Sequence, residues 1–253
     1  TGSHNIAIGL GALDGGNANE NIAIGAHVLG HGSLSGTWNV GVGHSALKAN
    51  TTGAENTSAG SYAMFSNTTG DGNVAFGLNA LYANTTANYN TAFGHKALQN
   101  NTTGGSNVAV GRDALKVSTT SDYNTAVGAL ALDANTTGHT NTVVGYAAGG
   151  AITTGHENVA IGANALDALT TGNDHVAVGY AALGALTTGA RNTAIGYGAG
   201  ANATTSNNNV LAGYDAGVQL TTGGANVAIG VYALDAATTN GANVAIGYQA
   251  LSA

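Results

Sequence analysis

The sequence contains no cysteine and no proline, and only 7% of its 253 residues are charged. Without cysteine, disulfides and thiolate metal sites are excluded. Five residues are Lys or Arg and twelve are Asp or Glu, so we expect no basic patch and no nucleic-acid partner. No apolar run approaches the roughly 20 residues of a membrane span, and we expect no membrane insertion by this segment.

Glycine is abundant, with 41 residues, and it recurs at a fixed interval. The motif Asn-x-Ala-x-Gly-x-x-Ala-Leu begins fifteen times, and from Asn39 onward each start lies 17 residues after the previous one. We number the repeat from the first residue of this motif. The fifteen starts are Asn5, Asn21, Asn39, Asn56, Asn73, Asn90, Asn107, Asn124, Asn141, Asn158, His175, Asn192, Asn209, Asn226 and Asn243. Such a period predicts stacked units, none of which folds alone.

Positions 2 to 4 combine β-branched or aromatic residues with a small residue at position 3, and Gly follows at position 5. This pattern predicts one short strand per repeat. The fold class is therefore all-β, a parallel β-solenoid (β-roll) of about fifteen 17-residue coils. We expect residues 5–253 to form one repeat solenoid, cut from a longer fibre, and residues 1–4 to be a cloning remnant.

Two columns of the repeat indicate structural roles. Gly occupies position 5 in all fifteen repeats, which indicates a positive φ or a close backbone approach. Asn occupies position 1 in fourteen repeats, either as a simple turn residue or as a ladder of amides bonded from coil to coil. Representative residues are Gly94, Gly111 and Gly128, and Asn90, Asn107 and Asn124.

The remainder of the repeat is harder to assign. Ala-Leu at positions 8 and 9 is compatible with a second strand or with one helical turn. Thr-Thr at positions 13 and 14 recurs in twelve successive repeats and indicates a turn. The residue before it is Asn in several repeats, and after Asn135 it becomes apolar in most, as at Leu169. That change predicts that one edge of the solenoid turns from polar to apolar along the chain.

Two groups of side chains are candidates for binding. Tyr180, Tyr197 and Tyr214 share position 6 in three consecutive repeats, as a platform for sugar rings, a structural ladder or a chain–chain contact. His139 and His156 share position 16 in neighbouring repeats and should stack, either as exposed loop residues or as a metal-binding pair. The exposed-loop interpretation is favoured, so we expect no metal site and no cofactor. Acidic residues are scattered over different positions, and we expect neither catalytic residues nor an enzyme.

The repeat resembles the head repeats of trimeric autotransporter adhesins, as in Asn158-Val159-Ala160-Ile161-Gly162-Ala163-Asn164-Ala165. It is still more similar to the repeats of bacteriophage tail fibres, as in Asn90-Thr91-Ala92-Phe93-Gly94 followed by Asn101-Thr102-Thr103-Gly104. The resemblance implies a parallel β-roll, a homotrimer, surface display and binding of cell surfaces. The adhesin unit is about three residues shorter and usually has Ser in place of Asn, so coil shape and trimer packing are expected to differ.

We therefore expect an adhesive or structural segment of a surface or tail fibre, located outside the cell on a cell surface or virion. Its expected partners are two further copies of the chain and a cell-surface receptor or glycan. Small side chains such as Ala92, Ala109 and Ala126 are expected to form the strand face on which another chain packs closely. The alternatives are an ice-binding solenoid that uses the Thr-Thr column and a purely mechanical spacer.

Overall fold

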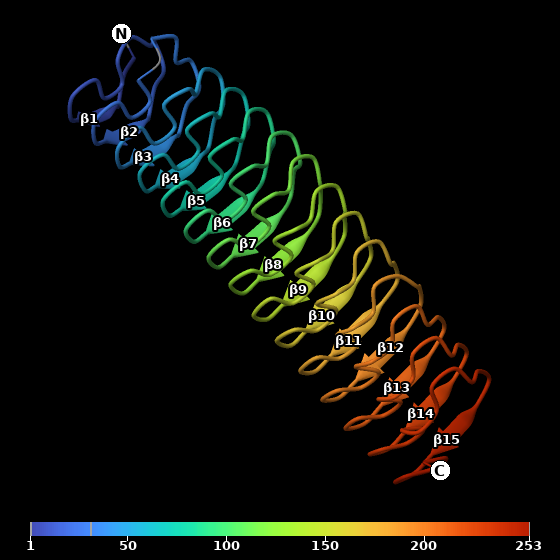
Figure 1. Cartoon of the computed structure of the whole chain (residues 1–253). Helices are drawn as coiled ribbons and strands as arrows, with labels where there is room; N and C mark the ends of the chain where they lie inside the picture. The colour runs from blue at the N-terminus through green and yellow to red at the C-terminus, as the bar shows by residue number, and fades with distance from the viewer. Residues whose placement is uncertain (1, 31, 253) are drawn as a thin grey trace. The chain divides into compact units, whose positions relative to one another are not determined.

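The computed structural model describes residues 2–30 and 32–252. Each repeat contributes one strand of three residues at positions 2 to 4, and the strands follow one another in chain order. The paired strands are parallel and in register, so that Val159, for example, faces Thr142 on one side and Val176 on the other. The prediction of an all-β parallel β-solenoid is confirmed, with about fourteen turns and no α-helix in the described residues (Figure 1).

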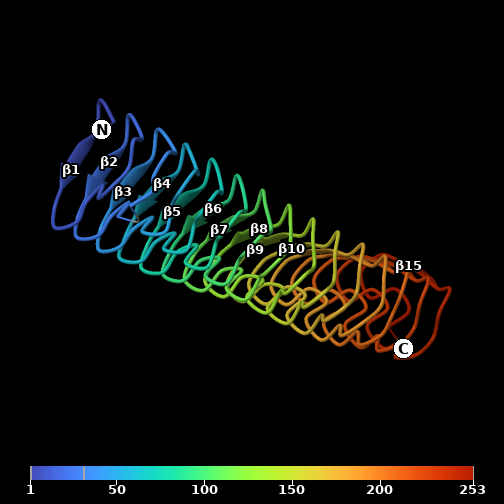
Figure 2. The same ribbon diagram turned by 90° about the horizontal axis from the view of Figure 1, so that it is seen from above.

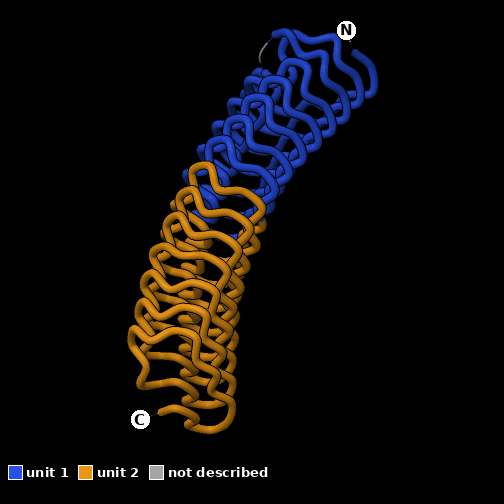
Figure 3. Tube along the Cα trace, turned by 90° about the vertical axis from the view of Figure 1, so that its right-hand side faces the viewer, with its two compact units in different colours: residues 1–124 blue, residues 125–253 orange. Residues whose placement is uncertain are grey.

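The chain divides into two compact units, residues 1–124 and 125–253 (Figure 3). In each of them the coils stack in chain order (Figure 2). The first unit contains β1 (Ile6–Ile8), β2 (Ile22–Ile24), β3 (Val40–Val42), β4 (Thr57–Ala59), β5 (Val74–Phe76), β6 (Thr91–Phe93) and β7 (Val108–Val110). The second contains β8 (Thr125–Val127), β9 (Thr142–Val144), β10 (Val159–Ile161), β11 (Val176–Val178), β12 (Thr193–Ile195), β13 (Val210–Ala212), β14 (Val227–Ile229) and β15 (Val244–Ile246).

The interior of each coil is formed by positions 1, 3, 8, 9, 12 and 15. Ala92, Ala109 and Ala126 at position 3 are fully buried inside their own coils. The expectation that they form a face for another chain is therefore wrong. Strand side chains alternate, and the coil is thin, so in most coils the side chain that points inward is small. Positions 2 and 4, with their larger β-branched and aromatic side chains, point outward.

The Ala-Leu segment belongs to a corner loop, positions 6 to 11, that is neither strand nor helix. Its residues at positions 7 and 9 have positive φ, as at Lys96 (60°) and Leu98 (50°). The Lys96 N–H donates to Leu78 of the preceding coil at 3.0 Å, and the Leu98 N–H donates to Ala114 of the following coil at 3.0 Å. The left-handed residues are unfavourable by roughly 1–2 kcal/mol each, and these bonds between coils offset that cost.

Glycine at position 5 turns the chain out of the strand and into the corner loop. Gly94, Gly111 and Gly128 have φ values of 137°, 137° and 141°. A Cβ on Gly94 would overlap the carbonyl oxygen of Gly111, and one on Gly128 would overlap that of Gly145. Both the backbone angle and the close approach of the next coil therefore require glycine.

Asparagine at position 1 forms a ladder inside the coils. The oxygen Oδ1 of Asn90 accepts the backbone N–H of Asn107 at 2.9 Å and its side-chain Nδ2 at 3.1 Å. The same Nδ2 also donates to the carbonyl of Ser121 in its own coil at 2.7 Å. Asn124 repeats the contact by donating its N–H to Asn107 Oδ1 at 2.9 Å. Each amide thus fixes the start of the next strand and closes its own turn.

Candidate functional site

The structure brings Tyr180, Tyr197 and Tyr214 together on the outside of the second unit. Their ring centroids are 5.0 Å and 5.1 Å apart, and the ring planes differ by 17° and 7°. Tyr232 contacts the last ring edge-on at 5.5 Å. The rings lie against one another, so both faces of Tyr197 are covered. Sugar stacking requires an open aromatic face, and this column exposes mainly ring edges and hydroxyl groups.

Charge accompanies this column only at its end. Asp215 follows Tyr214 directly, and its negative charge is the main reason why the pKa of Tyr214 is raised. The neighbouring Tyr232 adds a smaller effect in the same direction. The Tyr214 hydroxyl therefore remains a protonated donor at neutral pH, which is the form that binds acceptor oxygens.

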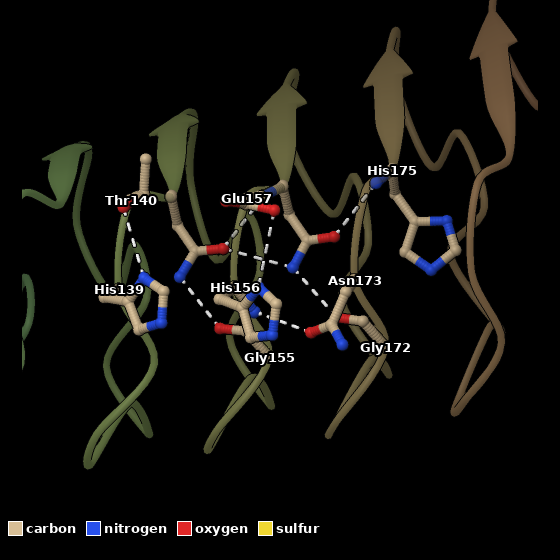
Figure 4. Close-up of polar contacts among 10 residues, drawn as sticks. His139, Thr140, Gly155, His156, Glu157, Gly172, Asn173 and His175 are labelled. Atoms are coloured by element: carbon tan, nitrogen blue, oxygen red, sulfur yellow. Dashed lines mark hydrogen bonds and ion pairs between the residues drawn. The ribbon is translucent and has the colours of Figure 1, made fainter.

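His175 is the one residue that breaks the Asn column, and it is fully buried (Figure 4). Its backbone N–H donates to Asn158 Oδ1 at 3.1 Å, as an Asn would. Its Nε2 lies 3.2 Å from the carbonyl of Gly189, and its Nδ1 accepts the N–H of Asn192 at 3.3 Å. Because Nε2 faces a carbonyl oxygen and Nδ1 faces an N–H, the ring is neutral and carries its proton on Nε2. Neutral imidazole thus reproduces the donor and the acceptor of the amide it replaces.

Burial is the main reason why the pKa of His175 is lowered to about 4. The carbonyl of Gly189 and the charge of Asp174 oppose that shift without cancelling it. A protonated ring would carry N–H groups on both nitrogens, and one of them would face the N–H of Asn192. Histidine is therefore compatible with the ladder only in its neutral form.

His139 and His156 stack as the sequence predicts, with centroids 4.8 Å apart and planes within 3° (Figure 4). His139 Nδ1 lies 3.2 Å from the Thr140 hydroxyl, and His156 Nδ1 lies 3.7 Å from the Glu157 carboxylate. Parallel rings at this spacing hold matching nitrogens farther apart than the roughly 3.3–3.4 Å that separates two nitrogen ligands of one tetrahedral zinc ion. Within the described residues, no three His, Asp or Glu side chains are grouped for metal binding.

The Thr-Thr segment separates into two columns with different surroundings. At position 13 the hydroxyl donates to the backbone of the next coil, as from Thr102 to Thr119 at 3.0 Å and from Thr153 to Thr170 at 3.1 Å. At position 14 the threonine is exposed in all twelve repeats. The position-14 threonines therefore form one exposed column along each unit, with one threonine per coil.

Position 12 lies inside the coils and not on an edge. In the first unit, Asn67 donates to Asn50 at 2.8 Å and Asn84 donates to Asn67 at 2.7 Å, forming a second amide ladder. In the second unit the column continues with buried Leu169 and Leu186. The predicted change from polar to apolar is thus real, but it occurs in the core. The Asn residues that precede Thr-Thr are all fully buried, namely Asn50, Asn67, Asn84, Asn101 and Asn135.

A cluster that the sequence analysis missed lies on the corner loops of the first unit. Tyr62, Leu78, Asn79, Tyr82 and Gln99 line an open cleft of about 450 Å³. The ring of Tyr82 stacks on Phe65 on one side, at 5.3 Å and 6°. These residues occupy positions 6, 7 and 10 of successive repeats. A comparison of equal positions between repeats therefore does not reveal that they are neighbours.

Four of the five basic residues lie on the same corner loops of the first unit. The four are Lys48, Lys96, Arg112 and Lys116. Asp113 is the one acid on these loops from coil three to coil seven, and it pairs with Arg112 at 2.6 Å and with Lys116 at 3.6 Å. The repeat thus aligns four cations on one side of the coil, but Lys48 lies three coils from Lys96 and two of the four are paired with Asp113, so the expectation of no basic patch stays a prediction.

Acids with a raised pKa are found at Asp167 and Asp215, both through burial. They belong to coils ten and thirteen, too far apart to act as a catalytic pair. No helix in the described part of the chain has the length and apolar character needed to cross a membrane. No family model matches the chain, and no match is found among curated proteins or among solved structures.

Proposed function

We propose that the chain is an adhesive or structural segment of a homotrimeric fibre on a cell surface or virion, and that it is not an enzyme. The observation that carries the proposal is the outward face of the strands. Position 2 is Val, Ile or Thr in every repeat, and position 4 is always apolar. A lone soluble chain rarely exposes a continuous apolar surface of this extent, and such surfaces mark association sites.

The large exposed fraction of the side chains on this face supports self-association. Ile161, Ile195 and Ile229 at position 4 are 40%, 48% and 41% exposed. Neither position 2 nor position 4 carries a charge in any repeat. Two further copies of the chain would present the same uncharged ladder at the same spacing, and a symmetric assembly would bury it. The exposed strand face is therefore the seam that we propose for the trimer.

Sedimentation velocity on the full chain tests the assembly. We expect a species of about three times 24.5 kDa for the unaltered chain. Introducing charge with Ile161→Lys and Ile195→Lys should shift the protein towards monomer. Thr154→Lys and Thr188→Lys place the same charges on the exposed position-14 column and serve as the matched control. A stable monomer of the unaltered chain, or an unchanged trimer with both isoleucines replaced, contradicts the proposal.

Ligand binding at a cell surface is the second part of the proposal. The tyrosine column of Tyr180, Tyr197 and Tyr214 would contribute hydroxyl groups and ring edges, and three chains would act together with avidity. Binding of the labelled protein to whole cells, compared with a Tyr180→Phe/Tyr197→Phe/Tyr214→Phe variant, measures this contribution. Unchanged binding by the variant would remove the tyrosine column from the proposal, and absence of binding to any cell tested would leave the mechanical spacer.

Ice binding is a second candidate, and the exposed threonine rank at position 14 favours it. A regular array on a surface with few charges is the feature it requires. The hydroxyls of position 13 are already donated to the backbone, so one rank is available per coil and not two. Thermal hysteresis of the purified protein tests this candidate. A freezing point below the melting point, abolished by Thr103→Val, Thr120→Val and Thr137→Val together, would favour ice binding over adhesion.

A further inference from the structure

We infer that the cleft formed by Tyr62, Leu78, Asn79, Tyr82 and Gln99 binds a saccharide that carries a carboxylate. This inference rests on the proposed adhesive function and gives it a site and a ligand class. The cleft lies entirely in the first unit, on the corner loops of coils four to six. Its volume of about 450 Å³ falls within the range of small-molecule sites, roughly 300–1,000 Å³.

Tyr82 provides an aromatic face without an aromatic neighbour. Phe65 at position 10 of the preceding coil covers one side of the ring, with centroids 5.3 Å apart. The next residue in that column is Gln99, which does not continue the aromatic stack. The C–H side of a sugar ring requires such a face, and Gln99 of the next coil also lines the cleft with an amide.

The second aromatic wall is held in place by its neighbours. Tyr62 contacts His44 edge-on at 5.1 Å and Phe65 at 5.8 Å, with the ring planes 69° and 57° apart. These contacts restrain the ring before any ligand arrives, which lowers the entropy cost of binding. Leu78 remains 45% exposed between the two aromatic residues and supplies an apolar base.

The polar groups of the cleft match sugar hydroxyls. Asn79 and Gln99 each offer an amide with two donor hydrogens and a carbonyl acceptor. Adjacent hydroxyl groups on a sugar act as donor and acceptor together, so one amide side chain bonds a pair of them. Asn79 is held by its backbone N–H, which donates to Ser61 at 3.1 Å. An apolar base with two amide side chains selects a hydroxyl-rich ligand over a purely hydrophobic one.

Charge beside the cleft indicates that the sugar is acidic. The Lys96 N–H donates to the carbonyl of Leu78 at 3.0 Å, which places the backbone of this lysine beside a residue that lines the cleft. Within the described residues Lys96 has no carboxylate partner, unlike Arg112 and Lys116. Lys48 lies on the other side, with Nζ 5.6 Å from the centre of the Phe65 ring. A chain of net charge −7 that gathers its cations here favours an anionic ligand.

Titration of the full-length chain with digalacturonic acid and with neutral digalactose, followed by NMR, tests the inference. We expect digalacturonic acid to shift the resonances of Tyr62 and Tyr82 and to bind more tightly than digalactose. Lys96→Gln should weaken the acidic disaccharide about fivefold and leave the neutral one unchanged, and added salt should reproduce that loss. Tyr82→Ala should weaken both at least about tenfold. Tyr123→Ala removes an exposed tyrosine of the same unit at position 17 and is the matched control.

Gln99→Glu provides a second variant that does not depend on removing a packed ring. It keeps the size of the side chain, adds a negative charge at the cleft, and should abolish binding of digalacturonic acid. The inference is overturned if neither disaccharide shifts these tyrosines, if both bind equally, or if Tyr123→Ala is as harmful as Tyr82→Ala. These outcomes are independent of the sedimentation and cell-binding experiments, so the site and the fibre function fail separately.

Discussion

The two units build the same coil around different interiors. At position 12 the first unit buries Asn50, Asn67, Asn84 and Asn101, whose amides bond from coil to coil. The second unit buries Ile152, Leu169 and Leu186 at the same position. The backbone bonds between coils are alike in both, as in Thr102 to Thr119 and Thr170 to Thr187, each at 2.9 Å. The backbone hydrogen bonds between coils therefore define the coil. The buried residue at position 12 can be polar or apolar, provided that its neighbours in the adjacent coils are of the same kind.

The apolar interior of the second unit is also adjusted in volume. Leu at position 9 is replaced by Gly200 and Gly217, and Leu211 replaces the usual small residue at position 3. A Cβ on Gly200 would lie 2.6 Å from Leu211 Cδ1, and one on Gly217 would lie 2.9 Å from Leu211 Cδ2. The space left by two leucines is thus occupied by one from the strand. Close packing requires such exchanges, because an unfilled space costs stability.

Charge differs as well. The first unit has four basic and six acidic residues, and the second has one basic and six acidic residues. The cleft and the nearby lysines Lys48 and Lys96 lie in the first unit, and the column of Tyr180, Tyr197 and Tyr214 lies in the second. The same scaffold thus presents two chemically different surfaces, because outward positions are not constrained by the neighbouring coil.

The largest expected effect is one that the units share. Gly94→Val and Gly128→Val should each destabilise by more than about 3 kcal/mol, because both introduce a β-branched residue at positive φ against the next coil. Thermal unfolding measures the change, and exposed Thr137→Ala, in the same coil as Gly128, is the control. A clearly smaller loss in one unit would show that the backbone constraint is not common to both.

Placing the position-12 residue of the first unit into the second unit should show that the two interiors are not interchangeable. Leu169→Asn places an amide between Ile152 and Leu186, neither of which offers a polar partner. The Gly172 carbonyl, equivalent to the one that Asn67 and Asn84 bond three residues on, is then the partner left within its own coil, and the change should cost about 3 kcal/mol. Leu169→Ile keeps the site apolar and should cost less than about 1.5 kcal/mol. Denaturant unfolding measures both. Equal losses for the two variants would mean that position 12 in the second unit is not selected for apolarity.

Acid should destabilise the second unit through His175. Because its pKa is about 4 in the folded chain and about 6.5 when unfolded, the stabilisation is complete above pH 6.5 and is lost as the pH falls towards 4. The expected loss is about 2 kcal/mol between pH 7.5 and pH 5. His175→Asn should remove this dependence, measured as unfolding free energy against pH. His139→Asn changes an exposed histidine and should retain it; the reverse result would refute the ladder role of His175.

The smallest expected effect is a gain in stability. Asn135 is buried at position 12, and neither polar atom of its side-chain amide has a hydrogen-bond partner among the residues that the structure describes. Asn135→Leu should stabilise the protein by about 1 kcal/mol, since it removes an unpaired buried amide. Asn84→Leu is the counterpart in the first unit and should destabilise, because Asn84 bonds both Asn67 and Asn101. Thermal unfolding of both variants decides whether the two positions differ in this way.

The sequence alone determined the coil length, the strand at positions 2 to 4, the glycine corner and the columns of like residues. A strict 17-residue step places Asn90 beside Asn107 and Tyr180 beside Tyr197 whatever the path of the chain between them. Stacking therefore follows from the period itself, because parallel coils in register must align equal positions.

Only the tertiary structure decided which columns face inward. Ala92 and Asn84 are inside and Ile161 is outside because left-handed residues at positions 7 and 9 set the path of the corner loop, and Leu98 or Lys96 gives no local signal for that conformation. The cleft between Tyr62 and Tyr82 and the neutral state of His175 depend on that path too. A repeat specifies which residues become neighbours along the stack, and the closure of the coil decides what surrounds them.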